Sequence, residues 1–210
     1  IYHCVDNISE SKYISKHGSA LERELIASFD LTITTSGRLR DYALQFSKNV
    51  VYLPNAADFQ LFQQAFGKRL PLPVELTEGR GQKIVGYIGS VDHRIDYSIL
   101  ISIVETYPTW TLLLVGPLSA EYRNSGLGLF RNVITTGSKK LIELPAYVNS
   151  MDCGIIPFLC NKLTESIYPL KLNEYLALGK PVVSTNFSAD LTDFCDVIKI
   201  ARSEEHTSEL

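Results

Sequence analysis

The sequence has no long apolar run, no excess of charge of one sign and no paired cysteine motif. No apolar stretch approaches the length of about 18 residues that a membrane-spanning helix needs. The formal net charge of −3 gives no basic footprint for nucleic acid. The four cysteines form no C-x-x-C pair, which favours reduced, buried thiols in a cytosolic protein over a disulfide framework.

The composition is that of a folded globular protein. Of the 210 residues, 45% are hydrophobic and 20% are charged, which is enough apolar material to bury a core and excludes disordered and collagen-like classes. The length accommodates one large domain or parts of two.

Both ends of the chain are interpreted as cut. The first residue is not Met, and residues 1–5 read as part of a strand. Residues 202–210 match, codon for codon, the translation of a common sequencing-adapter oligonucleotide, so we interpret them as a non-native tail and exclude them from fold reasoning.

Residues 1–58 read as strand, helix, strand, helix, strand. Ser19 and Glu22 form an S-x-x-E capping box, which predicts a helix start at that point. Ser36 is predicted to cap the second helix. Residues 59–82 have no clear period and include a Leu-Pro-Leu-Pro run, so they are predicted to be a linker.

Apolar strands alternate with helices from residue 83 to residue 201. Asp96 is predicted to cap one helix, and another begins at Pro169 and ends before Gly179. The expected strands are 84–88, 110–115, 132–135, 153–156, 181–184 and 197–200. This alternation predicts an α/β fold in which an open parallel sheet is covered by helices on both faces, separate from the sheet of residues 1–58.

The loop after the first of these strands is a candidate phosphate site. In the run G-Y-I-G-S at 86–90, Gly89 follows a buried strand and lets the backbone approach a phosphate closely. The run is not G-x-G-x-x-G, which argues against a dinucleotide-dependent dehydrogenase. Arg94 adds a cation nearby. A strand-ending turn and a surface arginine would explain the same residues.

A second candidate lies at the helix that begins at Pro169. Lys171 and Glu174 are three residues apart and share a helical face. A lysine in a first turn opposes the helix dipole, which is favourable if an anion binds there, and Glu174 can accept hydrogen bonds from a ribose diol. The amides of Ser166 and Ile167 are predicted to be free to point at a phosphate. The alternative is an ordinary surface pair of Lys171 and Glu174.

The stretch E-Y-L-A-L-G-K-P-V-V at 174–183 resembles bacterial group-1 (family 4-like) glycosyltransferases, and the resemblance extends over residues 1–201. These enzymes have two Rossmann-like domains, the GT-B fold. The resemblance implies that residues 1–58 are the C-terminal part of the acceptor-side domain. It also implies that residues 83–201 are the domain that binds the nucleotide-sugar.

The resemblance further implies a hexosyltransferase of surface or exopolysaccharide synthesis. Such an enzyme moves a sugar from a nucleotide-diphosphate donor to the hydroxyl of a saccharide or lipid-linked acceptor. It implies no cofactor and no metal, because lysine, arginine and helix amides stabilise the leaving diphosphate. It also implies no nucleic-acid partner and a cytoplasmic location, with membrane contact through a missing N-terminal part left open. The residues assigned are Lys171 and Arg94 as catalytic groups, and Gly89, Ser90, Ser166, Ile167 and Glu174 as donor-nucleotide ligands.

Two other functions stay open at this point. One is a nucleotide-sugar epimerase of the same fold. The other is a non-catalytic sugar-nucleotide-binding module, because Ser166 stands where many relatives have a glutamate. We expect residues 1–210 by themselves to be inactive, since closure of two complete domains assembles such a site.

Overall fold

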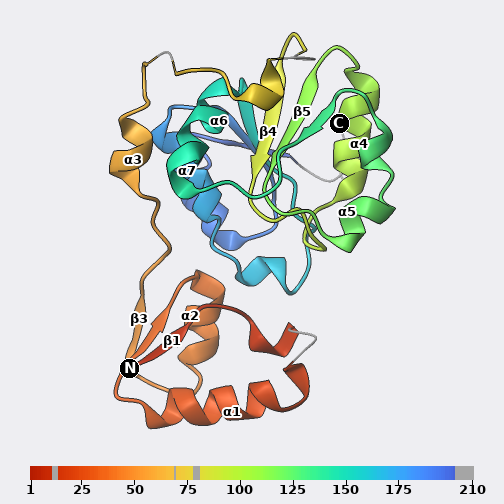
Figure 1. Ribbon diagram of the computed structural model, residues 1–210. Coiled ribbons are helices and arrows are strands. Elements are labelled where there is room, and N and C mark those ends of the chain that lie inside the picture. Colours follow the sequence, from red (N-terminus) through yellow and green to blue (C-terminus); the bar gives the residue numbers. More distant parts are fainter. Residues whose placement is uncertain (11–13, 69, 78–80, 202–210) are drawn as a thin grey trace, which may run out of the picture. The chain divides into compact units, whose positions relative to one another are not determined.

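The computed structural model of the chain describes residues 1–10, 14–68, 70–77 and 81–201. Their strands form two separate parallel sheets (Figure 1). The chain divides into two compact units. Unit 1 holds Ile1–Ala56, Cys160–Pro169 and Asn186–Phe194, and unit 2 holds Ala57–Leu159, Leu170–Thr185 and the residues from Cys195 on. The predicted non-native tail at 202–210 lies outside the described residues.

Unit 1 contains a three-stranded sheet in the order β1-β2-β3. Its strands are β1 (Tyr2–Cys4), β2 (Thr32–Thr34) and β3 (Val50–Tyr52), and its helices are α1 (Ser15–Ser28) and α2 (Gly37–Ala43). As predicted, Ser36 caps α2, because its hydroxyl accepts a hydrogen bond of 3.3 Å from the Leu39 amide. The short turns η1 (Ile8–Glu10), η5 (Thr164–Ser166) and η6 (Ala189–Phe194) also belong to this unit.

The predicted capping box at Ser19 and Glu22 is wrong. Helix α1 begins at Ser15, so Ser19 lies inside it. The Glu22 side chain is 3% exposed and accepts hydrogen bonds from Tyr2 Oη at 3.0 Å and Cys4 Sγ at 3.4 Å. Burial and the Glu22 carboxylate raise the pKa of the Cys4 thiol to about 12. Glu22 therefore ties α1 to β1 instead of capping a helix.

Unit 2 contains a six-stranded parallel sheet in the order β6-β5-β4-β7-β8-β9. Helices α4 and α5 lie on one face and α6 and α7 on the other (Figure 1), as predicted. The strands are β4 (Ile84–Ile88), β5 (Thr111–Val115), β6 (Val133–Thr135), β7 (Cys153–Ile156), β8 (Val182–Thr185) and β9 (Lys199–Ala201). The helices are α4 (Tyr97–Thr106), α5 (Ala120–Asn124), α6 (Leu144–Ser150) and α7 (Leu170–Ala177), with short turns η3 (Leu127–Leu129) and η4 (Leu141–Glu143).

The helix boundaries of unit 2 follow the sequence signals. Asp96 caps α4 through a 3.0 Å bond from the Ser98 amide, and Gly179, just beyond α7, adopts a left-handed φ of +63°.

Residues 59–82, interpreted as a linker, carry α3 (Phe59–Gln63) and η2 (Val74–Leu76) and group with unit 2. Glu75 in η2 is bonded by Lys139 Nζ at 2.6 Å and by Tyr147 Oη at 2.9 Å.

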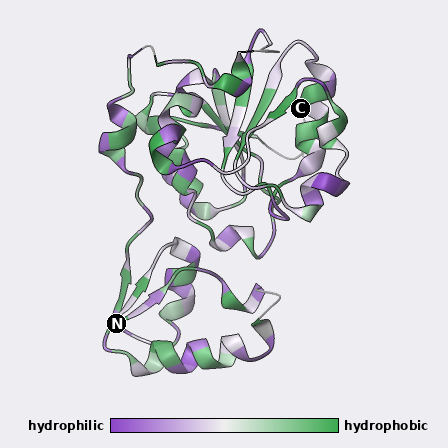
Figure 2. Cartoon of the chain, in the orientation of Figure 1, coloured by the Kyte–Doolittle hydropathy of each residue, from purple (hydrophilic) through white to green (hydrophobic). Residues whose placement is uncertain are grey.

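The core of unit 2 lies on the sheet. All residues of β4 and β5 are buried, and the strands are mostly hydrophobic (Figure 2).

No helix among the described residues is long and apolar enough to cross a membrane. The prediction that the cysteines are buried is wrong for Cys160 and Cys195, which are exposed.

Strands β4 and β7 pair over a short length and then separate. The ladder between them joins Val85 to Cys153 and Gly86 to Gly154. Beyond it, the Ile88 amide donates a 2.9 Å hydrogen bond to the hydroxyl of Tyr175, a fully buried residue of α7. The ring of Tyr175 packs on Gly154, where a Cβ atom would lie only 2.8 Å from it. Tyr175 thus fixes α7 to the point where the two strands part.

This arrangement predicts a stability cost for Tyr175→Phe. The change leaves the buried Ile88 amide without its acceptor and should lower the free energy of unfolding by about 1–3 kcal/mol. Tyr107→Phe is the matched control, because Tyr107 is 44% exposed and stacks on Trp110 through its ring. Thermal unfolding followed by circular dichroism measures both. Equal melting temperatures for the two variants would contradict the assigned role of the Tyr175 hydroxyl.

Candidate functional site

The candidate site lies where the strand order of unit 2 reverses direction. In chain order the six strands run 3-2-1-4-5-6, so the reversal falls between β4 and β7. Ligands of doubly wound sheets bind in the crevice at this switch point, outside the carboxyl ends of the strands. The segments that follow β4 and β7 meet here. Asp96 N donates to Pro157 O and Leu159 N donates to Arg94 O, each at 2.8 Å, and Ile95 bridges to Phe158.

Lys171 brings an ammonium group to this edge from the first turn of α7. Its Nζ lies 4.6 Å from the ring centre of Phe158 and 5.3 Å from that of Tyr87. Gly89, at the end of β4, has a φ of +125°, and a Cβ there would lie 3.3 Å from Lys171 Cε. A glycine at this position therefore leaves room for the lysine stem and for close approach of a ligand to the backbone. The Gly89 amide itself donates to Val115 O at 2.9 Å.

The electrostatics of Lys171 are those of a charge held partly away from water. Burial lowers its pKa to about 8, and the nearby Arg94 acts in the same direction. Glu174 and Asp92 act against both. At neutral pH the lysine is still mostly protonated, and a phosphate would supply the counter-charge that stabilises it.

Arg94 is held by a carboxylate in its own loop. Asp92 accepts bonds from Arg94 Nε at 2.9 Å, Nη2 at 2.6 Å and the backbone amide at 3.0 Å. Although burial acts to raise the pKa of Asp92, the Arg94 bonds bring it below its usual value. The Arg94 guanidinium also lies 5.6 Å from the ring centre of Phe158. Arg94, which the sequence predicts to bind phosphate, therefore lies near Lys171. Its guanidinium is already bonded to the Asp92 carboxylate.

Glu174 is buried one turn after Lys171. Its side chain is 9% exposed, and burial raises its pKa, although Lys171 acts in the opposite direction. No ion pair joins these two side chains, both of which the structure describes. The alternative of an ordinary surface pair is therefore wrong, since Glu174 is buried and forms no ion pair with Lys171.

Ser166 and Ile167 lie in unit 1 rather than unit 2. The Ser166 amide donates to Leu163 O at 3.4 Å and the Ile167 amide to Thr164 O at 3.0 Å. The prediction that these two amides are free is therefore wrong, because the η5 turn uses them internally.

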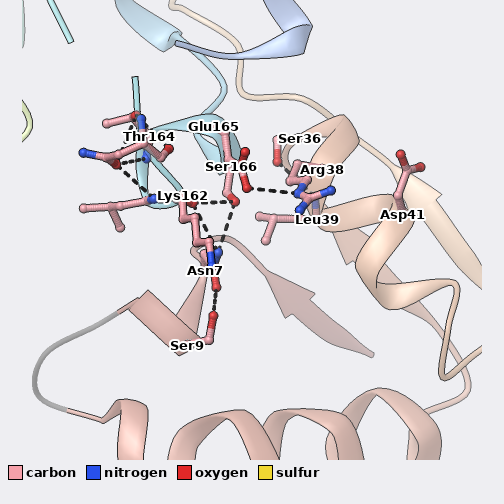
Figure 3. Close-up of polar contacts among 12 residues, drawn as sticks. Asn7, Ser9, Ser36, Arg38, Leu39, Asp41, Lys162, Thr164, Glu165 and Ser166 are labelled. Atoms are coloured by element: carbon pink, nitrogen blue, oxygen red, sulfur yellow. Dashed lines mark hydrogen bonds and ion pairs between the residues drawn. The ribbon is translucent and has the colours of Figure 1, made fainter. Parts of the chain in front are cut away.

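The η5 turn is held by polar side chains of unit 1 (Figure 3). Asn7 Nδ2 donates to Ser166 Oγ at 3.3 Å and to Lys162 O at 3.4 Å, while Arg38 Nε lies 3.3 Å from Glu165 Oε1. These residues line a polar cavity of about 290 Å³. Their contacts give Ser166 a defined place within unit 1.

The sequence placed all seven site residues in one domain, residues 83–201, whereas the structure has five of them in unit 2 and Ser166 and Ile167 in unit 1. The sequence also did not indicate the groups that hold them. Asp92, Tyr87, Phe158 and Tyr175 each contact a predicted site residue or fix its helix. The Asp-x-Arg spacing at 92–94 is the one local signal that could have revealed a partner. Nothing local indicates Phe158, because its contacts come from the pairing of two loops.

The strand order, the reversal and the position of Lys171 define a doubly wound fold with a lysine ammonium group at its switch point. Residues 82–199 match the sequence model of the family described as glycosyl transferases group 1. The chain belongs to this family.

Similarity to individual proteins agrees with the family. The chain is 35% identical over 134 residues to a Bacillus subtilis (strain 168) protein described as a teichuronic acid biosynthesis glycosyltransferase, TuaH. The match covers 63% of this chain and 33% of that protein, so the chain spans about a third of its length.

Solved structures of the GT-B class share the fold. HepE from Anabaena, in complex with UDP-glucose, superposes with a TM-score of 0.71 at 18% identity over 97% of this chain and 59% of HepE. Sucrose-phosphate synthase from Thermosynechococcus elongatus gives a TM-score of 0.70 at 19% identity, over 94% and 51% of the two chains. The predicted fold class is confirmed.

The lowered pKa of Lys171 predicts how stability depends on pH. An unfolded lysine titrates near pH 10.4, so between about pH 8 and about pH 10 the folded chain binds fewer protons than the unfolded chain. The cost of the half-buried ammonium is present below about pH 8 and is relieved above it, so this contribution to stability rises with pH. Lys171→Met removes the contribution.

Urea unfolding at several pH values, followed by fluorescence of Trp110, measures this effect. The difference in unfolding free energy, wild type minus Lys171→Met, should increase from about pH 7 to about pH 9.5. The same difference for Lys199→Met should stay flat, because Lys199 is exposed on β9. A flat difference for both variants would mean that Lys171 titrates normally.

Proposed function

We propose that this chain is part of a glycosyltransferase that moves a sugar from a nucleotide-diphosphate donor to an acceptor hydroxyl in the synthesis of a surface polysaccharide. The family gives the transferase class. The donor and the polysaccharide role are supported by relatives. HepE is solved with UDP and with UDP-glucose, and TuaH is described as a teichuronic acid enzyme. Because the chain covers a third of TuaH, the activity of the whole protein is part of the proposal.

One observation carries the proposal. A half-buried lysine ammonium lies at the switch point of the sheet, beside a glycine that leaves room for the lysine stem, and has no carboxylate bonded to it among the described residues. Such an arrangement is costly without an anion and favourable with one. A departing diphosphate is the anion that a sugar-transfer reaction supplies.

The residues of unit 2 divide the work of holding a nucleotide. Lys171 stabilises the negative charge that develops on the diphosphate as the sugar leaves, which is electrostatic transition-state stabilisation. Arg94, oriented by Asp92, adds a second cation. Glu174 lies three residues further along α7, about 4.5 Å along the axis, and its carboxylate accepts hydrogen bonds from the ribose hydroxyls.

Ser166 and Ile167 contribute through the position of the η5 turn and not through free amides. The Ser166 hydroxyl stands beside Asn7 in a polar cavity that suits a polyhydroxylated ligand. Metal-independent catalysis stays a prediction, with Lys171 and Arg94 supplying the positive charge. Location on the inner face of a membrane likewise stays a prediction.

The complete enzyme supplied with nucleotide-sugar tests the proposal directly. Donor consumption that requires an acceptor, with release of the nucleoside diphosphate, is the expected result. Conversion of the donor without any acceptor would indicate an epimerase. Tight donor binding without turnover under either condition would indicate a binding module.

Lys171→Met should weaken binding of UDP by about 10- to 100-fold, the range for loss of a charge-assisted hydrogen bond. Near pH 8 about half of the wild-type Lys171 side chains are neutral. Binding of an anion should therefore take up a fraction of a proton. Calorimetry in two buffers of different ionisation enthalpy measures affinity and uptake together. Lys199→Met is the control, and a Lys171→Met variant that matches it in both quantities would refute the assigned role.

Glu174→Gln should weaken UDP binding by about 1–3 kcal/mol while leaving the melting temperature close to that of the wild type. The amide keeps the size of the side chain but loses the charge that strengthens bonds from ribose hydroxyls. Glu105→Gln, on the exposed face of α4, is the matched control. Titration with uridine as well as UDP isolates the ribose contact. Unchanged uridine affinity in Glu174→Gln would remove Glu174 from the nucleotide site.

A further inference from the structure

We propose that Phe158 is a positioning residue whose aromatic face holds the Lys171 ammonium in its charged form, and the Arg94 guanidinium beside it, at the anion site. Nothing in the sequence motif marks Phe158 for this role. The ring would act on the Lys171 ammonium before any ligand binds. Its nucleotide-binding consequence rests on the proposed function, whereas its effect on Lys171 does not.

The geometry places two cations over one ring. Lys171 Nζ lies 4.6 Å from the Phe158 ring centre and Arg94 Cζ lies 5.6 Å from it. Cations within about 6 Å of an aromatic centroid are attracted by the negative face of the ring, and the attraction grows when the cation is desolvated. Phe158 is itself 1% exposed, so its ring is shielded from water where it contacts the two cations.

The backbone fixes Phe158 relative to Arg94. The segment 157–159 is bonded to the loop after β4 at both ends, by Asp96 N to Pro157 O and by Leu159 N to Arg94 O. Lys171 approaches from a different element, α7, which the Tyr175 hydroxyl ties to Ile88. Side chains from the loop after β4 and from α7 therefore meet at the ring of Phe158.

The charge balance around Lys171 explains why an aromatic face is useful. Arg94, from the loop after β4, repels the ammonium, while Asp92 in the same loop and Glu174 on α7 favour it. Asp92 is already bonded to Arg94, and Glu174 is not paired with Lys171. Tyr87, from β4, offers a second ring at 5.3 Å. A carboxylate bonded to Lys171 would neutralise the site, whereas a ring stabilises the ammonium and leaves its charge available to a phosphate.

Graded fluorination of Phe158 tests the inference, because fluorine weakens the negative face of the ring while changing its volume little. Phenylalanines with one to five ring fluorines are incorporated at position 158 of the full chain. The pKa of Lys171 is followed by the carbon-13 shift of its Cε, assigned with Lys171→Arg. We expect the pKa to fall with each added fluorine, by about 0.4 to 1.5 pH units for the fully fluorinated ring.

The matched control is the same series at Phe62, a fully buried residue of α3. The Phe62 series introduces fluorine into the core but leaves the Phe158 ring unchanged, so the pKa of Lys171 should stay constant. Phe158→Leu, which keeps apolar volume but has no ring, should lower the pKa as the fully fluorinated ring does. A Lys171 pKa that is the same across the Phe158 series, or that moves equally in the Phe62 series, would overturn the inference.

The affinity for UDP provides a second readout. Near pH 8 the fully fluorinated ring should weaken UDP binding by about 2- to 15-fold, the change in the protonated fraction of Lys171, and the ratio should fall to about 2 or less near pH 6.5. A ring that only packs would give a ratio independent of pH. If wild-type protein fails to bind UDP, the proposed function fails, while the pKa series still decides the role of Phe158.

Discussion

The separation of β4 from β7 after Gly86 and Gly154 is the constraint on which the site depends. Paired strands would satisfy their own amides and leave no opening. Here the Ile88 amide turns to the Tyr175 hydroxyl of α7, so the helix that carries Lys171 and Glu174 is fixed at the opening itself. The absence of side chains at Gly154 and Gly89 allows this close approach of helix and sheet. The fold thus places the Lys171 ammonium at the point where the two strands part.

The site holds two cations and two carboxylates, but no carboxylate is bonded to the Lys171 ammonium among the described residues. Asp92 is bonded to Arg94, and Glu174 is buried without contacting Lys171. Lys171 lies instead against the rings of Tyr87 and Phe158, and its pKa is lowered to about 8 by burial first and by Arg94 second. A charged group kept under such conditions is more stable when a phosphate is bound, which links the electrostatics of the free protein to the proposed transfer of a sugar from a diphosphate.

Local signals in the sequence were sufficient for much of unit 2 but not for the contacts within its site. Asp96 and Gly179 end their helices as predicted, since capping and left-handed turns depend on a few neighbouring residues. The predicted capping box at Glu22 was wrong, because the hydrogen-bond partners of Glu22, Tyr2 and Cys4, belong to another element. Phe158 could not be predicted for the same reason, since the bridge to Ile95 joins loops that are distant in the chain. The division into units also departs from sequence order, with 160–169 and 186–194 grouped with the first sheet.

A crystal structure of the chain with UDP bound tests most directly whether Lys171 holds the diphosphate. We expect a β-phosphate oxygen within hydrogen-bond distance of Lys171 Nζ, close to Gly89, with the ribose hydroxyls at the Glu174 carboxylate. A nucleotide bound elsewhere on the sheet, with Lys171 still resting on the rings of Tyr87 and Phe158 and no phosphate beside it, would contradict the central claim.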